Sequence, residues 1–384
     1  MIFIKFLPYG KQYIDENDIN AVLNVLKSDF ITQGPKVGEF ERKLAEYSGS
    51  KYAVSFNSGT SALHGAYFAL GIGKGDEIIT SPNTFVATSN AALYLNANPI
   101  FADVEKDTGN LDVSKVKDNI TDKTKLIVPV HYSGNPVDLR ELHKIAEEND
   151  IKIIEDAAHA MGATYNKHKI GNSRYSEMSI FSFHPVKHIT TGEGGAVLTN
   201  NRDYYEKLLM FRSHGITKDH FINKPDGDWY YEMHYLGFNY RITDIQAVLG
   251  LSQLKKLDEF VERRRNIAEL YEKSFENNPF FETITEKECC KSSYHLYPIL
   301  IKDDYKDKKE EIFLKMRKEG LGVQVHYIPI YLQPYYKKLG YEKGLCPVSE
   351  DFYHREISIP LYPSMDNKDV AYVIKKIFKV FKDL

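Results

Sequence analysis

Short apolar runs alternate with longer amphipathic segments along much of the chain. Between residues 50 and 250, β-rich runs are separated by segments in which apolar residues recur at helical spacing. This alternation is typical of an α/β fold, in which a mostly parallel sheet carries helices on both faces. The runs at 126–130 and 151–154 are largely apolar, as expected of strands buried on both sides. The predicted strands are 52–56, 77–80, 99–104, 126–132, 152–156, 178–183 and 196–199.

The pattern changes beyond residue 243. Residues 244–275 have apolar positions near helical spacing and then a charged stretch, so we predict one long helix that bridges two domains. We interpret the three arginines at 263–265 as a solvated face of this helix. The fold class is therefore predicted as α/β, with a large domain over residues 1–250 and a smaller C-terminal α+β domain over residues 251–384. The remaining predicted elements are strands at 295–301 and 323–326, a helix at 309–319 and a terminal helix from Asp366.

Composition and charge disfavour several kinds of partner. The chain has 384 residues and an apolar fraction of 42%, which is typical of a globular protein. Lys plus Arg (50) nearly balance Asp plus Glu (53), and the net charge of -3 favours neither nucleic acid nor an anionic membrane. Residues 1–7 lack a cleavage signal and are too short to span a membrane, so we expect a cytoplasmic protein. Three cysteines without zinc-ligand spacing predict neither a disulfide framework nor a metal site.

Lys187 is the first candidate for chemistry. It follows the predicted strand at 178–183 and precedes a turn that contains Gly192, Gly194 and Gly195. A lysine at the edge of a buried sheet is desolvated, which lowers its pKa and makes the neutral, nucleophilic amine accessible. The alternative is an ordinary lysine on a surface loop, which fits this residue when it is considered alone.

Asp156 and a hydroxyl-rich turn accompany this lysine. Asp156 ends an apolar strand, where a buried acid needs a cationic partner such as a protonated pyridine nitrogen; capping of a following helix is the alternative. Ser58, Gly59 and Thr60 follow the strand at 52–56 and open a helix, so they either bind a phosphate or simply cap the helix. A phosphate cradle, a strand-end acid and a strand-end lysine, in this order on a parallel sheet, are the parts of a pyridoxal 5'-phosphate site.

Further motifs run through essentially the whole chain. They include Thr84-Phe85-Val86-Ala87-Thr88, Asp156-Ala157-Ala158-His159-Ala160, the segment 181–195 and Gly237-Phe238-Asn239-Tyr240-Arg241. With these motifs the sequence resembles the DegT/DnrJ/EryC1/StrS sugar aminotransferases, which have the type I fold of pyridoxal-phosphate-dependent aminotransferases. The segments 211–215, 295–300, 323–327 and 350–354 most resemble the members of this family that act in pseudaminic acid biosynthesis.

The resemblance implies roles for the residues of the cofactor site. Lys187 matches the lysine that holds the cofactor as a Schiff base, and Asp156 matches the partner of the pyridine nitrogen. Phe85 matches an aromatic residue that stacks on the ring, and His159 follows the acid in the same pocket. Asn239 matches a residue that reaches the cofactor phosphate of the neighbouring subunit, which implies a homodimer with shared active sites. The residues that match phosphate contacts are Ser58, Gly59, Thr60 and Ser182.

The resemblance also implies a nucleotide-sugar substrate. Arg241 is a candidate for binding the donor carboxylate, because a guanidinium pairs with a carboxylate in bidentate fashion; a role at a dimer interface or helix start is the alternative. His326 and Tyr327 lie at a predicted strand end, where simple packing is the alternative. The residues that match nucleotide-sugar contacts are Tyr9, Asp29, Phe30, Ile31, Thr32, His326, Tyr327, Ile328 and Pro329.

Two positions depart from the most similar subfamily. His188 stands where near relatives often have proline, which alters the rigidity of the loop but leaves the nucleophile intact. Gly59 follows the wider family, whereas near relatives tend to have alanine at this position. Neither departure changes the chemistry that the resemblance implies.

The sequence thus predicts transfer of an amino group from L-glutamate to C4 of a UDP-linked 4-keto-6-deoxy-N-acetylhexosamine. Pyridoxamine phosphate is the expected intermediate form of the cofactor, and the freed Lys187 is the expected general base. Amination at C3, glutamine as the donor, and bacillosamine- or perosamine-type sugars are alternatives that use similar machinery.

Three other functions fit the residues less well. A 4-keto-sugar dehydratase of the same fold has histidine in place of the lysine. A Rossmann dehydrogenase needs an early glycine fingerprint, which the sequence lacks. A non-catalytic, cofactor-binding regulator is disfavoured by the balanced charge and by the absence of a recognisable DNA-reading motif.

Overall fold

A seven-stranded sheet lies at the centre of the protein, whose computed structural model describes residues 5–219 and 221–384. The strand order is β2-β10-β9-β6-β5-β3-β4. The strands from β9 to β4 are parallel to their neighbours, whereas β10 is antiparallel to both β2 and β9. The predicted α/β class with a mostly parallel sheet is confirmed. The strands are β2 (Tyr52–Phe56), β3 (Glu77–Thr80), β4 (Asn98–Phe101), β5 (Thr124–Val128), β6 (Lys152–Asp156), β9 (Met178–Ser182) and β10 (Gly195–Thr199).

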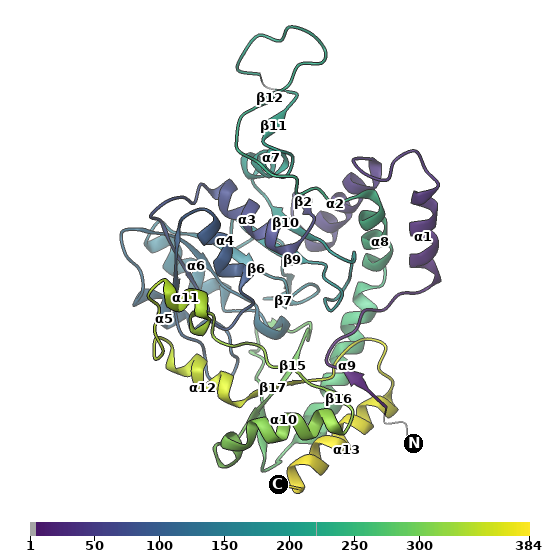
Figure 1. Cartoon of the computed structure of the whole chain (residues 1–384), viewed down its shortest axis with the longest axis vertical. Coiled ribbons are helices and arrows are strands. Elements are labelled where there is room, and N and C mark those ends of the chain that lie inside the picture. The colour runs from purple at the N-terminus through teal and green to yellow at the C-terminus, as the bar shows by residue number, and fades with distance from the viewer. Residues whose placement is uncertain (1–4, 220) are drawn as a thin grey trace.

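Helices cover both faces of this sheet (Figure 1). Successive strand residues point to opposite faces, so Val54 packs with α3 while its neighbour Ala53 belongs to the core that includes α2. Because both faces are covered, the strands lack the polar alternation of a sheet that faces water. No helix in the described ranges is long and apolar enough to cross a membrane, and the cytoplasmic location stays a prediction. The helices that cover the sheet include α2 (Pro35–Ser48), α3 (Gly59–Leu70), α4 (Ala87–Tyr94), α5 (Val113–Lys117), α6 (Leu139–Glu148) and α7 (Arg202–Phe211), whereas α1 (Glu16–Leu26) packs against α8 (Asp244–Leu254).

A second apolar core lies in the C-terminal part of the chain. It combines an antiparallel sheet, ordered β13-β15-β17, with α9, α10 and α13. The N-terminal strand β1 (Leu7–Pro8) pairs with β16 (Leu321–Gly322) beside this core, while a boundary at residue 250 stays a prediction. The elements are α8 (Asp244–Leu254), α9 (Leu257–Phe275), β13 (Phe281–Thr283), β15 (Tyr297–Ile301), α10 (Lys309–Lys318), α11 (Pro334–Lys338), α12 (Pro347–Arg355), β17 (Glu356–Ile359) and α13 (Asn367–Lys382). Short strand pairings are formed by β7 (Thr164–Tyr165), β8 (His168–Lys169), β14 (Cys290–Lys291), β11 (Ile216–Thr217) and β12 (Glu232–Met233).

The prediction that residues 244–275 form one continuous helix is wrong. The segment forms α8 and α9, which are separated at Lys255 and Lys256. The amine of Lys256 lies 3.0 Å from Asp15 and 2.7 Å from Asp18, so the break is fastened to the start of α1. The interpretation of residues 263–265 as a solvated face is also wrong, because Arg264 is buried and donates to three backbone carbonyl groups.

The predicted strand at 323–326 is also wrong. Only Gln324 pairs there, through an isolated bridge to Ser358. The amide of His326 donates to the side chain of Glu356 at 2.7 Å instead of to a neighbouring strand, which ends the ladder.

Asp244 joins two helices and gives a test of the fold. Its buried carboxylate accepts hydrogen bonds from the amides of Gly34 (2.7 Å) and Lys36 (2.8 Å) at the start of α2. Asp244→Ala removes both charge-assisted bonds and is expected to lower the free energy of unfolding by about 2–4 kcal/mol, as measured by urea denaturation. Asp203→Ala, at an exposed position in the first turn of α7, is the control and is expected to cost less than about 0.5 kcal/mol. Equal losses in the two variants would contradict this role of Asp244.

Candidate active site

The ends of β6 and β9 and the turn after β2 meet at one edge of the central sheet. Strand β10 lies between β2 and β9, and its first residue, Gly195, pairs with both Phe56 and Ser182. A Cβ atom on Gly195 would lie 2.5 Å from the carbonyl oxygen of Ser58, and one on Gly59 would lie 3.0 Å from the Cβ atom of Ser182. The two glycines therefore allow the turn before α3 to approach Ser182.

This turn keeps helix amides available for an anion. Ser58 is the N-cap of α3, and its Oγ accepts a hydrogen bond from the amide of Ser61 at 3.1 Å. The cap interpretation is therefore correct for the Ser58 side chain. The amides of Gly59 and Thr60 lie in the first helical turn, where the helix offers no carbonyl partner. Together with the Ser182 hydroxyl they form a place where a phosphate can bind.

Asp156 is the buried last residue of β6. Its Oδ2 accepts a hydrogen bond from the hydroxyl of Thr88 at 2.7 Å, and its Oδ1 accepts one from the amide of Ala158 at 3.1 Å. Residues 157–163 form turns and no helix, so the helix-cap alternative for this carboxylate is wrong. An ionised carboxylate held in this way can pair with a cationic ring nitrogen.

Lys187 is half-buried in the loop that follows β9. Its Nζ lies 3.3 Å from Nε2 of His295. Burial lowers the pKa of Lys187 to about 8, and the carboxylate of Asp156 acts in the opposite direction. A fraction of the amine is therefore neutral near neutral pH, and the neutral amine is the form that attacks a carbonyl.

Four buried histidines lie near this amine: His159, His188, His295 and His326. The ring of His295 lies 4.3 Å from that of His159 and 5.6 Å from that of His188, measured between centroids. Burial lowers the pKa of all four rings, to about 3 for His326, and the charge of Lys187 lowers each of them further. The rings are therefore neutral, and the tautomer of each decides which nitrogen donates a hydrogen bond.

Three members of this arrangement were not among the predicted site residues: His188, His295 and Thr88. His295 and Lys187 are 108 positions apart, and no local pattern connects them. Thr88 stands in a recognised motif, but only the folded chain shows that its hydroxyl binds Asp156. The three residues stand in a helix, a loop and just before a strand, so no shared local pattern marked them.

Two of the predicted substrate residues, Tyr9 and Tyr327, adjoin the histidines, and a third, His326, is one of them. The rings of Tyr9 and His326 lie 5.1 Å apart, and the hydroxyl of Tyr327 lies 3.1 Å from Nε2 of His159. The amide of Tyr327 donates to the side chain of Asn83 at 3.1 Å, which holds the segment against the central sheet. Farther along this segment, Ile328 is exposed and Pro329 is buried.

The other predicted residues lie on exposed or half-buried segments. In the described part of the chain, their side chains form no hydrogen bond or ion pair, so their roles stay predictions. Thr32 pairs with Thr243, which places its segment beside the start of α8, and Phe85 is 58% exposed. These residues are Asp29, Phe30, Ile31, Thr32, Phe85, Asn239 and Arg241.

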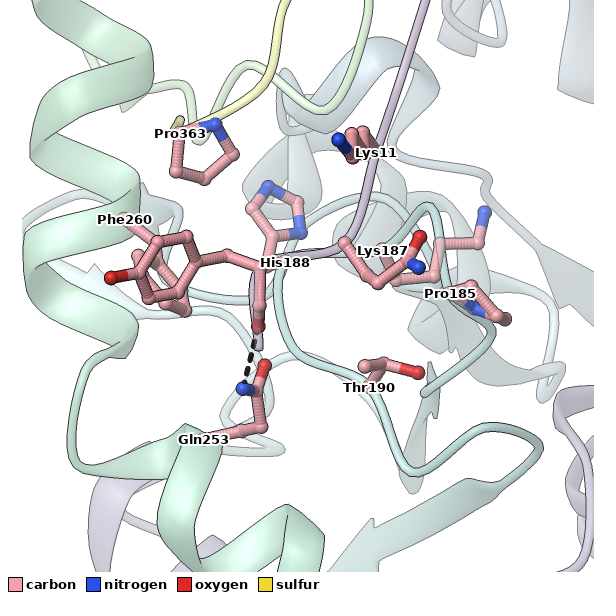
Figure 2. A pocket seen from close by; sticks show the side chains of 10 residues that line it. Lys11, Pro185, Lys187, His188, Thr190, Gln253, Phe260 and Pro363 are labelled. Atoms are coloured by element: carbon pink, nitrogen blue, oxygen red, sulfur yellow. Dashed lines mark hydrogen bonds between the residues drawn. The ribbon is translucent and has the colours of Figure 1, made fainter. Parts of the chain in front are cut away.

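A small cavity lies beside Lys187 (Figure 2). Lys11 and His188 also line it, and the side chain of Gln253 donates to the carbonyl of Tyr13 at 2.9 Å, which fastens the N-terminal segment to α8. This cavity is too narrow even for a water molecule, so a nucleotide sugar cannot occupy it. The larger substrate must therefore approach the amine from another side.

Comparison with known proteins identifies the class of protein. The structure matches those of solved aminotransferases over almost the whole chain. The chain belongs to the DegT/DnrJ/EryC1/StrS aminotransferase family, whose model matches residues 12–378. The predicted fold class and family are confirmed.

Similar proteins cover almost the whole chain. It is 43% identical over 379 residues to the UDP-4-amino-4,6-dideoxy-N-acetyl-beta-L-altrosamine transaminase of Campylobacter jejuni, with 98% of each chain covered. Helicobacter pylori PseC, an aminotransferase involved in pseudaminic acid biosynthesis, matches with a TM-score of 0.93 at 38% identity, covering 99% of this chain and 100% of that chain. The PLP form of Streptococcus pneumoniae Spr1654 matches with a TM-score of 0.92 at 30% identity, covering 98% and 99%.

The environment of Lys187 predicts how its amine reacts. In the cofactor-free protein, modification of Lys187 by an amine-specific reagent is expected to rise with pH through a midpoint of about 8, because only the neutral amine reacts. Asp156→Asn removes the charge that raises this pKa, so the midpoint moves to lower pH. Peptide mass spectrometry over a pH series measures both midpoints, with the exposed lysines as internal controls. A wild-type midpoint at the ordinary lysine value of 10.5 would show that burial does not act on this amine.

Proposed function

We propose that the protein moves an amino group from L-glutamate to C4 of a UDP-linked 4-keto-6-deoxy-N-acetylhexosamine, with pyridoxal phosphate as cofactor. The product is the UDP-4-amino-4,6-dideoxy-N-acetyl sugar for which the Campylobacter jejuni transaminase is named, and the reaction belongs to pseudaminic acid biosynthesis, in which Helicobacter pylori PseC takes part. The observation that carries the proposal is the amine of Lys187, whose pKa is lowered to about 8 by burial beside Asp156. The identity of 43% to the Campylobacter jejuni enzyme supports the sugar class.

The residues at the sheet edge fit pyridoxal phosphate. Asp156 is the partner for its ring nitrogen, and Lys187 is the amine for its aldehyde. When bound, this group accepts the electron pair that remains on a carbon after it loses a proton. The PLP form of the similar protein Spr1654 supports this cofactor. The residues available to the phosphate are Gly59 and Thr60 through their amides and Ser182 through its hydroxyl.

In this proposal Lys187 is the base that takes a proton from the substrate and returns it. A base is most effective when its pKa lies near the working pH, and a pKa of about 8 lets Nζ accept a proton from a substrate carbon and return it. The hydrogen bonds from Thr88 and Ala158 hold the carboxylate of Asp156 in place. Tyr327 and His159, which are hydrogen-bonded to each other, form the wall toward the sugar.

We also propose a homodimer with shared active sites. The segment between β11 and β12 projects from the body of the protein (Figure 1). Its Ile222 and Trp229 are 80% and 76% exposed, and Leu236 just beyond β12 is 80% exposed. Large exposed apolar side chains mark interaction surfaces, and a second copy of the chain would bury them. In such a dimer, the exposed Asn239 and the half-buried Arg241 are available to a neighbouring cofactor and to the glutamate carboxylate.

Borohydride trapping tests the covalent role of Lys187. Reduction of the pyridoxal-phosphate-loaded protein is expected to leave a pyridoxyl group on Lys187, identified by peptide mapping. Lys11 lines the same cavity and is the matched control, because it stands on the N-terminal segment rather than in the loop after β9 and should stay unlabelled. A tag on Lys11, or no tag on folded and loaded protein, would remove the proposed nucleophile.

A substrate panel tests the reaction. The loaded protein is incubated with L-glutamate and UDP- or dTDP-linked 4-keto sugars, and NMR identifies the amino sugar formed. We expect amination at C4 of the UDP-linked N-acetyl sugar, and a loss of at least about 10³-fold in turnover for Lys187→Ala, because proton transfer by a positioned group contributes about 10²–10⁴-fold. Amination of dTDP-linked sugars alone would contradict the proposed pathway while leaving the reaction class intact.

A further inference from the structure

A chain of hydrogen bonds runs from the C-terminal sheet to the ring of His326. Oε2 of Glu356 accepts the amide of His326 at 2.7 Å, and Oε1 accepts the hydroxyl of Ser358 at 2.5 Å. Oγ of Ser358 in turn lies 2.8 Å from Nδ1 of His326. Glu356 and Ser358 are fully buried, so water does not compete for these bonds.

Counting protons along this chain fixes the tautomer of the ring. An ionised carboxylate only accepts hydrogen bonds, so the single proton of the Ser358 hydroxyl is donated to Glu356. Oγ of Ser358 must then accept from Nδ1 of His326, which therefore carries the ring proton. The ring is neutral, so Nε2 is left as a bare acceptor. Nε2 makes no hydrogen bond within the described ranges, and the ring lies beside Tyr9 near the amine of Lys187.

The charge of Glu356 decides this arrangement. Burial raises the pKa of Glu356 to about 7, and the ammonium group of Lys309 on α10 lowers it. The other titratable groups that sense Glu356 are the hydroxyls of Tyr132 and Tyr327, which stay protonated because burial raises their pKa values. Above its pKa the carboxylate is ionised, and the proton count above holds.

We propose that Glu356 is a positioning residue that acts through Ser358 to hold His326 as the Nδ1-protonated tautomer, so that Nε2 accepts a hydrogen bond from the sugar nucleotide. The second half of this inference rests on the proposed function. A bare acceptor selects a donor, such as a sugar hydroxyl or the N–H of an acetamido group. It does not pair with a diphosphate, whose oxygens are acceptors themselves. His326 thus contributes to recognition of the sugar rather than of the diphosphate.

Glu356→Gln is the informative substitution because it keeps the shape and changes the proton count. The carbonyl of the new amide must face the amide of His326, so its NH₂ group faces Ser358 and donates to it. The serine hydroxyl then donates to Nδ1, and the ring proton moves to Nε2. Glu350→Gln is the matched control. Glu350 is also buried and also accepts from a hydroxyl, that of Tyr331 at 2.8 Å, and from an amide, that of Gly344 at 2.6 Å.

The tautomer is read directly by NMR on the full chain without substrate. Long-range ¹H–¹⁵N correlation of ¹⁵N-histidine-labelled protein, recorded about one pH unit above the pKa of Glu356, reports which ring nitrogen is protonated. Loss of a signal in His326→Ala assigns the ring. We expect a protonated Nδ1 in the wild type and in Glu350→Gln, a protonated Nε2 in Glu356→Gln, and a mixture in Ser358→Ala. A protonated Nε2 in the wild type, or the same tautomer in wild type and Glu356→Gln, overturns the proposal.

Kinetics test what the free nitrogen recognises. With an N–H at Nε2 facing a substrate donor, Glu356→Gln is expected to raise KM for the UDP-4-keto sugar about tenfold, since one lost hydrogen bond is worth about 1–2 kcal/mol. The half-reaction with L-glutamate, which does not use the sugar, should be unchanged. An unchanged KM for the sugar together with the expected tautomers overturns the acceptor role. If no sugar in the panel is aminated by the wild type, the proposed function fails and the substrate part of this inference falls with it, whereas the NMR result decides the tautomer by itself.

Discussion

Removal of one lysine amine from water is the constraint on which the site depends. An amine in water keeps its proton, and Lys187 gives it up readily only because it lies against buried groups. The two sides of this contact come from different cores: Lys187 follows β9 of the central sheet, whereas His295, whose Nε2 lies 3.3 Å from the amine, precedes β15 of the C-terminal sheet. Arg264 of α9 donates to the carbonyl of His295 at 3.2 Å and holds that residue in place. The two cores must therefore be packed together before the amine acquires its lowered pKa.

Backbone geometry determines the opposite side of the site. The antiparallel strand β10 begins where its neighbours β2 and β9 end, so Gly195 lies between Phe56 and Ser182. Any side chain at Gly195 would meet the backbone of Ser58. The turn at Ser58 can approach Ser182 only because Gly59 and Gly195 lack side chains. The amine of Lys187, in contrast, depends on large buried side chains that pack around it. Both conditions are met at the same edge of one sheet.

Local pattern was sufficient for most of the central sheet. The strands at 52–56, 77–80 and 152–156 were predicted with the bounds that the structure has, because each is a compact run flanked by turn residues. The antiparallel direction of β10 was not predicted. The direction of a strand depends on the strands it pairs with, and a short apolar run looks the same in either direction. The break between α8 and α9 was missed because lysines are good helix formers, and the cause lies far away in Asp15 and Asp18.

The residues predicted to hold the cofactor were easier to find in the sequence than those predicted to bind the substrate. Asp156 ends a strand, and Ser58 and Lys187 follow the ends of two others, so the order of the strands brings them together. His295 contacts Lys187 across 108 residues of sequence. Glu356 contacts His326 but lies outside every recognised motif. The predicted strand at 323–326 failed at the position where Glu356 takes over the amide of His326.

The segment around His326 is held by both sheets, but the ring of His326 is held only from the C-terminal one among the described residues. Its anchors, Glu356 and Ser358, belong to β17, which shares no strand with the central sheet. In the proposed function, replacements in β17 therefore change the hydrogen bonds of the His326 ring, while the strand ends at Asp156 and Ser182 remain as they are. An engineer who wants a new amino sugar from this scaffold should begin there.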